Sequence, residues 1–123
     1  MSFFKFFKKR TTKIQMPAFP ERAQKLLDTY GFEFSQIPKE EIIDLLNKEI
    51  ENPHEESAEY VRILCGYLYC IGGEDVIQLL EKAKYGINMD VGCMIDSDWI
   101  DNLKNEGDRT REELVLEFIH YYK

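Results

Sequence analysis

The chain has 123 residues, of which 44% are hydrophobic, 13% aromatic and 32% charged, so it is long enough for one globular domain and too short for two. Sixteen basic and 23 acidic side chains give a net charge of −7, and no segment approaches the roughly 18 to 20 consecutive apolar residues of a membrane-spanning helix. The three cysteines are an odd number without close pairing, which favours a reducing cytoplasm over a disulfide-bonded scaffold.

Charge is distributed unevenly along the chain. Residues 1–16 hold five basic residues and no acidic one, whereas residues 17–123 hold eleven basic and 23 acidic residues, a net charge of −12. We therefore divide the chain into a basic, Phe-rich N-terminal segment (1–16) and a single acidic domain (17–123). Binding to nucleic acid is disfavoured, because it requires clustered Lys and Arg and no basic stripe is present outside the segment.

The N-terminal segment has the pattern of a weak interfacial anchor. Three of its phenylalanines are spaced i, i+3, i+4 and would share one face of a short helix, with lysines on the other sides. The residues concerned are Phe3, Phe6, Phe7, Lys5, Lys8 and Lys9. Lysines near anionic lipid contribute roughly 1 kcal/mol each, so peripheral membrane contact through residues 1–10 is one interpretation. Docking of the Phe face on the protein's own core or on a second copy, and disorder, are the alternatives.

Six helices are predicted from the apolar periodicity and from residues that begin and end helices. Pro20 and Pro38 suit the first turns of two helices, where a missing N–H costs nothing, and Gly31 is a natural helix stop. The stretch 63–71 is apolar around its whole circumference, which indicates a buried central helix. Thr110, with a Glu three residues later, forms a capping box. The predicted helices cover residues 20–30, 38–52, 57–71, 76–86, 96–107 and 110–122.

The predicted fold class is all-α, with one domain of about six helices and no convincing strand. Loops of only a few residues force successive helices to pack antiparallel. An antiparallel helical bundle and a HEAT-like stack of helix pairs are both compatible with the pattern, because no internal repeat decides between them. Residues 87–94 are expected to be irregular.

The sequence carries little that indicates catalysis or metal binding. His54 and His120 lie in a predicted loop and in the last helix, and neither belongs to a recognisable motif with a nucleophile and an orienting acid. Cys65, Cys70 and Cys93 have no CxxC spacing and are expected to be buried small hydrophobes. Phosphate-binding, dinucleotide-binding and hydrolase motifs are missing. We therefore expect no cofactor, no metal site and no catalytic residue.

The most distinctive part of the chain is the run Gly66-Tyr67-Leu68-Tyr69-Cys70-Ile71-Gly72-Gly73, followed after one helix by Asp90-Val91-Gly92-Cys93-Met94-Ile95-Asp96. With the small acidic helical body, this profile resembles, over roughly residues 38–104, the small immunity proteins that bacteria pair with polymorphic or contact-dependent toxins. The resemblance implies a non-catalytic inhibitor that covers the basic active site of a toxin with acidic and aromatic residues. An acidic inhibitor of a basic nuclease gains fast, electrostatically steered association.

Two groups of residues are candidates for contact with a protein partner that has a basic surface. The first group lies near the ends of predicted helices and comprises Asp90, Asp96, Asp98, Trp99 and Asp101. The second group lies at the start of the central helix and comprises Glu55, Glu56 and Glu59. Helix caps, the helix dipole and a solvated acidic face also account for these carboxylates, and a lone Trp on a short amphipathic helix is more often a core residue.

The leading interpretation is a non-catalytic protein-binding module of the immunity type. The second is a peripheral membrane or scaffold adaptor that uses the Phe-rich N-terminal segment. The third is an enzyme that uses carboxylates such as Asp90, Asp96 and Asp98, for which a pocket containing a carboxylate with a raised pKa would be the minimum support.

Overall fold

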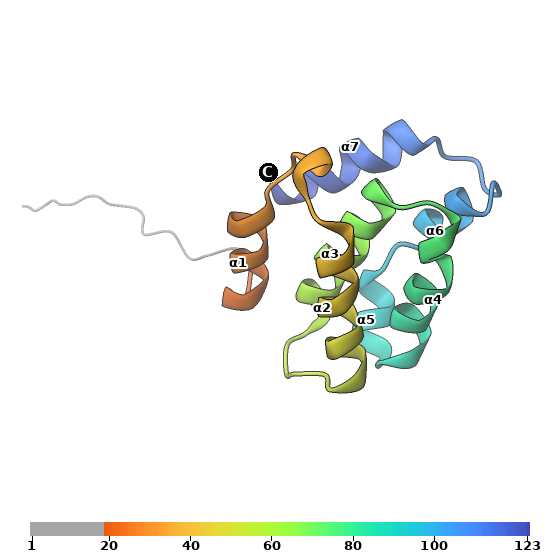
Figure 1. Cartoon of the computed structure of the whole chain (residues 1–123). Coiled ribbons are helices and arrows are strands. Elements are labelled where there is room, and N and C mark those ends of the chain that lie inside the picture. The colour runs from red at the N-terminus through yellow and green to blue at the C-terminus, as the bar shows by residue number, and fades with distance from the viewer. Residues whose placement is uncertain (1–18) are drawn as a thin grey trace, which may run out of the picture.

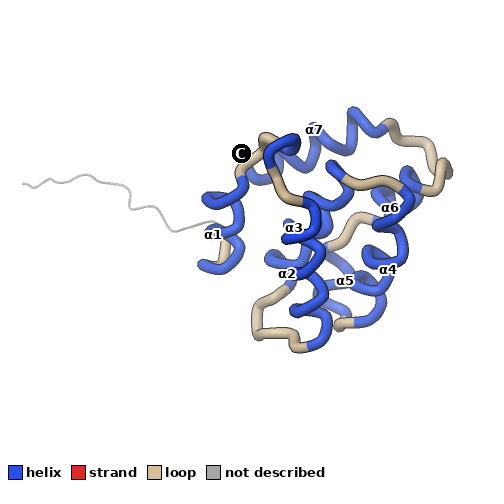
Figure 2. Tube along the Cα trace, viewed as in Figure 1, coloured by secondary structure: helices blue, strands red, loops and turns tan. Residues whose placement is uncertain are grey.

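The computed structural model describes residues 19–123, which form seven α-helices and two short 3₁₀ helices around one hydrophobic core (Figures 1 and 2). The prediction of an all-α, single-domain fold is confirmed. The α-helices are α1 (Glu21–Tyr30), α2 (Lys39–Glu51), α3 (Ala58–Ile71), α4 (Ile77–Gly86), α5 (Met89–Met94), α6 (Ser97–Leu103) and α7 (Arg111–Tyr122), and the 3₁₀ helices are η1 (Phe34–Gln36) and η2 (Glu74–Val76). Within this described part, none of the helices is both long and apolar enough to cross a membrane.

The residues proposed for membrane contact lie outside the described residues. They are Phe3, Phe6, Phe7, Lys5, Lys8 and Lys9. The boundary between the N-terminal segment and the acidic domain lies there as well, so both remain predictions.

The helix count of six was too low, because the stretch predicted to be irregular contains α5. This short helix is held at both ends by side chains. Its N-cap residue Asn88 accepts a hydrogen bond from the N–H of Val91 at 2.9 Å. The Lys84 ammonium donates to the carbonyls of Gly92 and Ile95, at 2.7 and 2.6 Å, and so satisfies oxygens that the end of a helix leaves without partners. A six-residue helix is too short to show apolar periodicity, and the sequence pattern therefore missed it.

Two of the local start and stop signals are confirmed in the structure, whereas the helix predicted over residues 96–107 already ends at Leu103. The Thr110 hydroxyl accepts from the N–H of Glu113 at 3.1 Å, and the Glu113 carboxylate accepts from the N–H of Thr110 at 3.0 Å, which completes the capping box of α7. Gly31 ends α1 with φ of 61°, a left-handed conformation that glycine adopts without steric cost, and its N–H donates to the carbonyl of Leu27 at 2.9 Å.

The last helix, α7, lies across one end of the bundle that α2, α3 and α4 form, instead of continuing a row of stacked helix pairs (Figure 1). Its anchor is Phe118, which is 1% exposed and packs directly on Gly66 in the middle of α3. A Cβ atom at position 66 would lie 2.6 Å from two atoms of the Phe118 ring and closer still to a third. The missing side chain at Gly66 therefore lets α7 approach the central helix.

Candidate functional site

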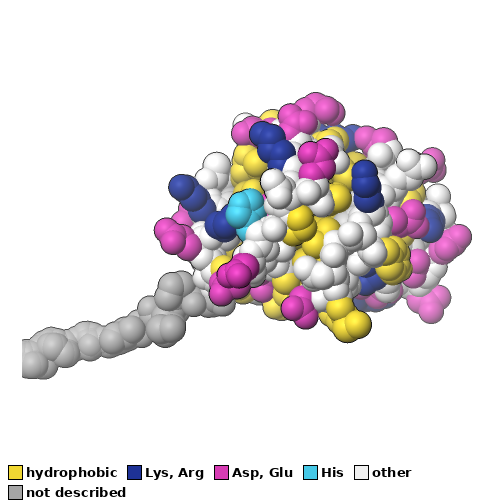
Figure 3. All heavy atoms as spheres, turned by 90° about the horizontal axis from the view of Figure 1, so that it is seen from below, with side chains coloured by type: hydrophobic (Ala, Val, Ile, Leu, Met, Phe, Trp, Pro, Cys, Tyr) yellow, Lys and Arg dark blue, Asp and Glu magenta, His cyan; other side chains and the backbone are white. Residues whose placement is uncertain are grey.

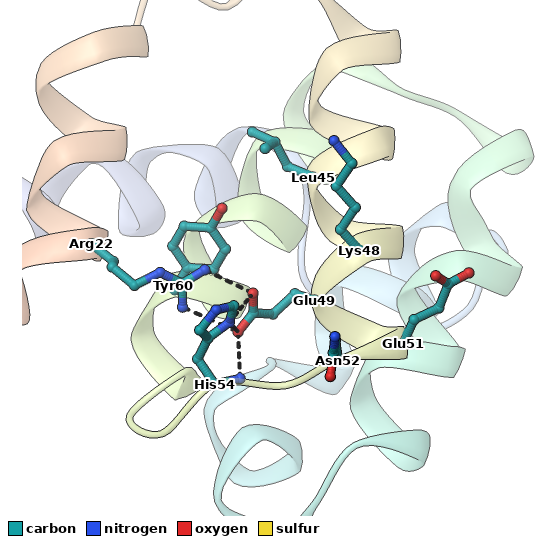
Figure 4. A pocket seen from close by; sticks show the side chains of 8 residues that line it. All are labelled: Arg22, Leu45, Lys48, Glu49, Glu51, Asn52, His54 and Tyr60. Carbon is teal, nitrogen blue, oxygen red and sulfur yellow. Dashed lines mark hydrogen bonds and ion pairs between the residues drawn. The ribbon is translucent and has the colours of Figure 1, made fainter.

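A buried carboxylate lies where α1, α2 and the loop after α2 meet (Figure 4). The Glu49 side chain is 3% exposed and accepts two hydrogen bonds from the Arg22 guanidinium, at 2.8 and 3.1 Å. It also accepts from the backbone N–H of His54 at 3.0 Å and lies 3.2 Å from the Nδ1 atom of that ring. The Arg22 guanidinium stacks on the Tyr60 ring, 3.9 Å from its centroid. The cluster thus joins α1 to the end of α2, to the loop that follows α2 and, through Tyr60, to α3.

The electrostatics of this cluster indicate a structural clamp. Burial alone would raise the pKa of Glu49, but the hydrogen bonds from Arg22 and His54 outweigh it and hold that pKa below its usual value. The carboxylate is therefore ionised and fully bonded at neutral pH, which is the opposite of the raised pKa that a general acid requires. Lys48 and Glu51 line the same pocket, with their charged ends directed away from the carboxylate (Figure 4).

His54 is predicted to lie in a loop outside any catalytic motif, and the structure shows that it is a partner of Glu49. Its side chain is 61% exposed, so the ring is open to solvent on one side while Nδ1 faces the carboxylate. The sequence contains no signal for the pairing of Glu49 with Arg22, because 27 residues separate these two partners.

An acidic stretch covers α6, the α6–α7 loop and the first two turns of α7. Residues 96–117 hold eight acidic and three basic side chains, and we call the acidic residues that are exposed or half-buried here the acidic surface. They are Asp96, Asp98, Asp101, Glu106, Asp108, Glu112, Glu113 and Glu117. Figure 2 shows that the long loop between α6 and α7 leads directly from one of these helices to the other.

All three basic residues of this stretch are engaged by partners. Lys104 pairs with Glu81 of α4 at 2.7 Å. Arg109 bonds both oxygens of Glu117, at 3.0 and 3.1 Å, and lies 3.5 Å from Asp98. Arg111 donates to the two carbonyls at the end of α3, at 3.0 and 2.8 Å. The carboxylates of Asp108 and Glu112 have no side-chain cation of the described residues bound to them, so the surface keeps an uncompensated negative charge.

An apolar strip borders the acidic surface on α7. Leu116 and Tyr121 are 47% and 50% exposed, and they line a shallow depression together with Arg109, Glu113, Glu117 and His120. The Arg62 guanidinium stacks on the Tyr121 ring, 4.2 Å from its centroid, and so holds the ring in place. A preorganised aromatic side chain beside carboxylates is typical of protein-binding surfaces.

Sequence reasoning missed Leu116 and Tyr121 although a signal was present. The stripe of the last helix that faces the core comprises the buried Leu114 and Phe118 and the half-buried Val115, Ile119 and Tyr122. Leu116 and Tyr121 lie off this stripe, and a large apolar residue off the buried face of an amphipathic helix is expected to be exposed.

The structure places the first group of predicted contact residues in three different environments. Asp98 and Asp101 lie on the acidic surface, half-buried, and Asp96 caps α6 by accepting from the N–H of Asp98 at 2.9 Å. Asp90 is exposed on α5, outside that surface. The prediction of Trp99 as a contact residue is wrong, because its indole is 1% exposed and packs between the Tyr69 and Phe118 rings of the core.

The second group of predicted residues is divided between an exposed loop and a contact with α7. Glu55 and Glu56 are exposed in the loop before α3, at the end opposite α7 (Figure 1). Glu59 is half-buried and accepts a hydrogen bond from the hydroxyl of Tyr122 at the end of α7. Burial, followed by this bond to Glu59, raises the pKa of Tyr122 above its usual value. Glu59 therefore holds α7 in place, whereas the other two remain free carboxylates.

A second exposed apolar area lies at the corner between α4 and α5, and we call it the α4–α5 corner. Tyr85 and Met89 are 74% and 81% exposed there, with Cys93 exposed one helical turn further on. Figure 3 views this end of the bundle and shows hydrophobic side chains at the surface among charged ones. The expectation that all three cysteines are buried is correct for Cys65 and wrong for Cys93.

Among residues 19–123, no group of three or more His, Cys, Asp or Glu side chains is arranged to hold a metal ion. No protein-family model matches the chain, and neither a curated protein nor a solved structure shows significant similarity to it.

Proposed function

We propose that the chain is a non-catalytic, cytoplasmic protein-binding module that binds a basic protein partner through the acidic surface and the adjoining Leu116 and Tyr121. The observation that carries this proposal is the state of the charges on residues 96–117. The acidic residues outnumber the basic ones by eight to three, and every basic residue is already engaged within the fold. This surface therefore carries a net negative charge, which attracts a basic partner.

The combination of charge and exposed apolar area suits a binding surface that is both fast and stable. Carboxylates that lie open to solvent increase the rate of encounter with a basic partner and fix the orientation of approach. Burial of apolar area then slows dissociation, and Leu116 and Tyr121 supply it in the same depression as Glu113 and Glu117. Charge alone would not slow dissociation, and apolar area alone would not speed the encounter.

An immunity-type inhibitor that neutralises a cognate toxin is the specific form of this proposal. The resemblance of the sequence to immunity proteins implies such a role, and a toxin that binds phosphate must itself carry a basic site. The acidic surface supports the proposal, because its excess of carboxylates suits contact with a basic site. The adaptor alternative depends on residues 1–10, which lie outside the described residues.

Affinity capture with matched charge variants tests the proposal. The full chain serves as bait in lysate of the cells that make it, at low and high salt, with stoichiometric partners identified by mass spectrometry. The surface variant combines Asp108→Asn, Glu112→Gln and Glu113→Gln, in which the Gln at position 113 preserves the capping box. The control variant removes three exposed carboxylates from α2 with Glu40→Gln, Asp44→Asn and Glu51→Gln, so the two baits have equal net charge.

We expect one dominant basic partner. At low salt the wild-type chain and the control variant should capture it, and the surface variant should capture clearly less of it. Expression of that partner alone should be toxic, and co-expression of the chain should relieve the toxicity. Equal capture by the two variants, or capture of no basic partner by any bait, would contradict the proposal.

A further inference from the structure

The described chain begins on the surface of α7. The Phe19 ring packs against two tyrosines at the end of this helix, with its centroid 6.1 Å from that of Tyr121 and 5.0 Å from that of Tyr122. Tyr121 itself lines the shallow depression that contains Leu116 and Glu117. Whatever precedes Phe19 therefore starts at the edge of an exposed acidic and apolar depression.

The N-terminal segment has the composition that this depression complements. Residues 3–10 contain four Phe and four basic side chains and no acidic one. The depression offers Leu116 and Tyr121 as apolar contacts, with Glu113 beside them and Glu112 one position before, while both oxygens of Glu117 are bonded to Arg109. Its Arg109 is already bonded to two carboxylates, so it adds no free positive charge that would repel the lysines.

We propose that residues 3–10 of the same chain bind in the depression on α7 and cover the apolar border of the acidic surface. The docked segment also competes with the basic partner for this surface, and that second clause rests on the proposed function. The docking itself does not rest on the proposed function, because it requires only that residues 3–10 complement the depression on α7 of the same chain.

The connecting chain is long enough for this docking. Residues 11–18 are eight residues and span at most roughly 26–29 Å at 3.3–3.6 Å per residue. The α7 helix has twelve residues and is about 18 Å long at 1.5 Å per residue. Every position on the outer face of α7 is thus within reach from Phe19. A short tether gives the segment a local concentration in the millimolar range, which makes even a weak contact populated.

The α4–α5 corner is the natural comparison, because Tyr85 and Met89 are more exposed than Leu116 and Tyr121. The charged residues nearest to the corner in sequence are Lys82, Lys84 and a single acid, Asp90. Such surroundings do not attract a basic segment. Hydrophobicity alone would therefore direct the phenylalanines to the corner, whereas the combination of charge and hydrophobicity directs them to α7.

Photocross-linking of the full chain distinguishes binding of residues 3–10 to α7 of the same chain from binding to the α4–α5 corner or to a second chain. A photoreactive benzoylphenylalanine replaces Phe6, the protein is irradiated at low micromolar concentration, and the cross-linked peptides are identified by mass spectrometry. We expect cross-links within one chain to the peptide containing Leu116 and Tyr121, with a yield that falls as salt is added. Cross-links that join two chains, that map mainly to the α4–α5 corner, or that do not form would overturn the proposal.

Two double variants test whether the cross-link depends on α7. Both change exposed residues, so both should leave the fold intact. Leu116→Ser with Glu113→Gln should lower the intramolecular yield roughly fivefold or more, the factor expected when half of a leucine side chain is no longer buried on docking. Tyr85→Ser with Met89→Ser changes two exposed residues of the α4–α5 corner and should leave the yield unchanged. Equal yields from both variants would contradict the assignment to α7. The cross-link requires no partner protein, so failed capture of a partner leaves this result standing, and a failed cross-link leaves the proposed function standing.

Discussion

The contact that positions α7, and with it the acidic surface, is the approach of Phe118 to Gly66. We predict that Gly66→Ala destabilises the protein, although alanine normally favours a helix over glycine by about 1 kcal/mol. The new Cβ would overlap three atoms of the Phe118 ring, two of them at 2.6 Å. That ring is 1% exposed and is enclosed by other aromatic side chains, including Tyr67 and Trp99 at centroid distances of 5.9 and 5.8 Å, so it has no space into which to move.

Overpacking of a rigid core costs about 1–3 kcal/mol and occasionally more. An overlap with three ring atoms places Gly66→Ala at or above the top of that range, so a net loss of about 2 kcal/mol remains after the gain in helix propensity. With a urea m-value of about 1–2 kcal/mol per molar, the midpoint of unfolding should fall by roughly 1–2 M.

Urea unfolding followed by circular dichroism measures this effect, and Gly86→Ala is the matched control. A Cβ at position 86, at the end of α4, would meet only the Cγ of Lys82 at 4.0 Å, so this variant should be as stable as the wild type or slightly more. A Gly66→Ala protein with an unchanged or higher midpoint would refute the account of how α7 is anchored.

Three further predictions concern the clamp, the thiols and the helix cap. Glu49→Gln should lower the free energy of unfolding by about 1–3 kcal/mol above the usual Glu pKa, since Arg22 and the N–H of His54 lose a charged acceptor that is itself buried. Because the folded-state pKa of Glu49 is depressed, its contribution is lost as pH falls through that lower value, so the difference in urea midpoint between wild type and variant should shrink towards acid pH. A disulfide reagent should modify Cys93 in the folded state while the buried Cys65 reacts only on unfolding, and equal rates would contradict the burial pattern. Thr110→Ala should cost about 1 kcal/mol in the same urea assay, and no change would mean that the capping box does not stabilise α7.

The helices could be predicted because their ends are encoded by local chemistry. Pro38 precedes the first residue of α2, Gly31 ends α1, and the Thr110 capping box forms as the sequence indicates. Each of these signals involves residues at most four positions apart, so it can be recognised in the sequence without knowledge of the tertiary structure. The short α5 escaped the same reasoning because it depends on Lys84, a side chain from the preceding helix.

The candidate site was only partly predictable. The acidic character of residues 96–117 is visible in the sequence, and Asp98 and Asp101 do lie on the acidic surface. Burial of Trp99 was the alternative that the sequence itself favoured, because a lone Trp on a short amphipathic helix is more often a core residue than a contact residue. The Gly66 and Phe118 contact joins residues more than 50 positions apart, and such pairings arise only from the packing of the whole fold.

The central claim is that a basic partner approaches the acidic surface, and the association rate tests it most directly. Once the dominant partner is captured, its association and dissociation rates are measured with the wild-type chain, the surface variant and the α2 control variant at low and high salt. We predict that the surface variant associates at least about tenfold more slowly at low salt, that high salt narrows the difference, and that the control matches the wild type. Equal association rates for the surface variant and the wild type would contradict the claim and place the interface elsewhere on the molecule.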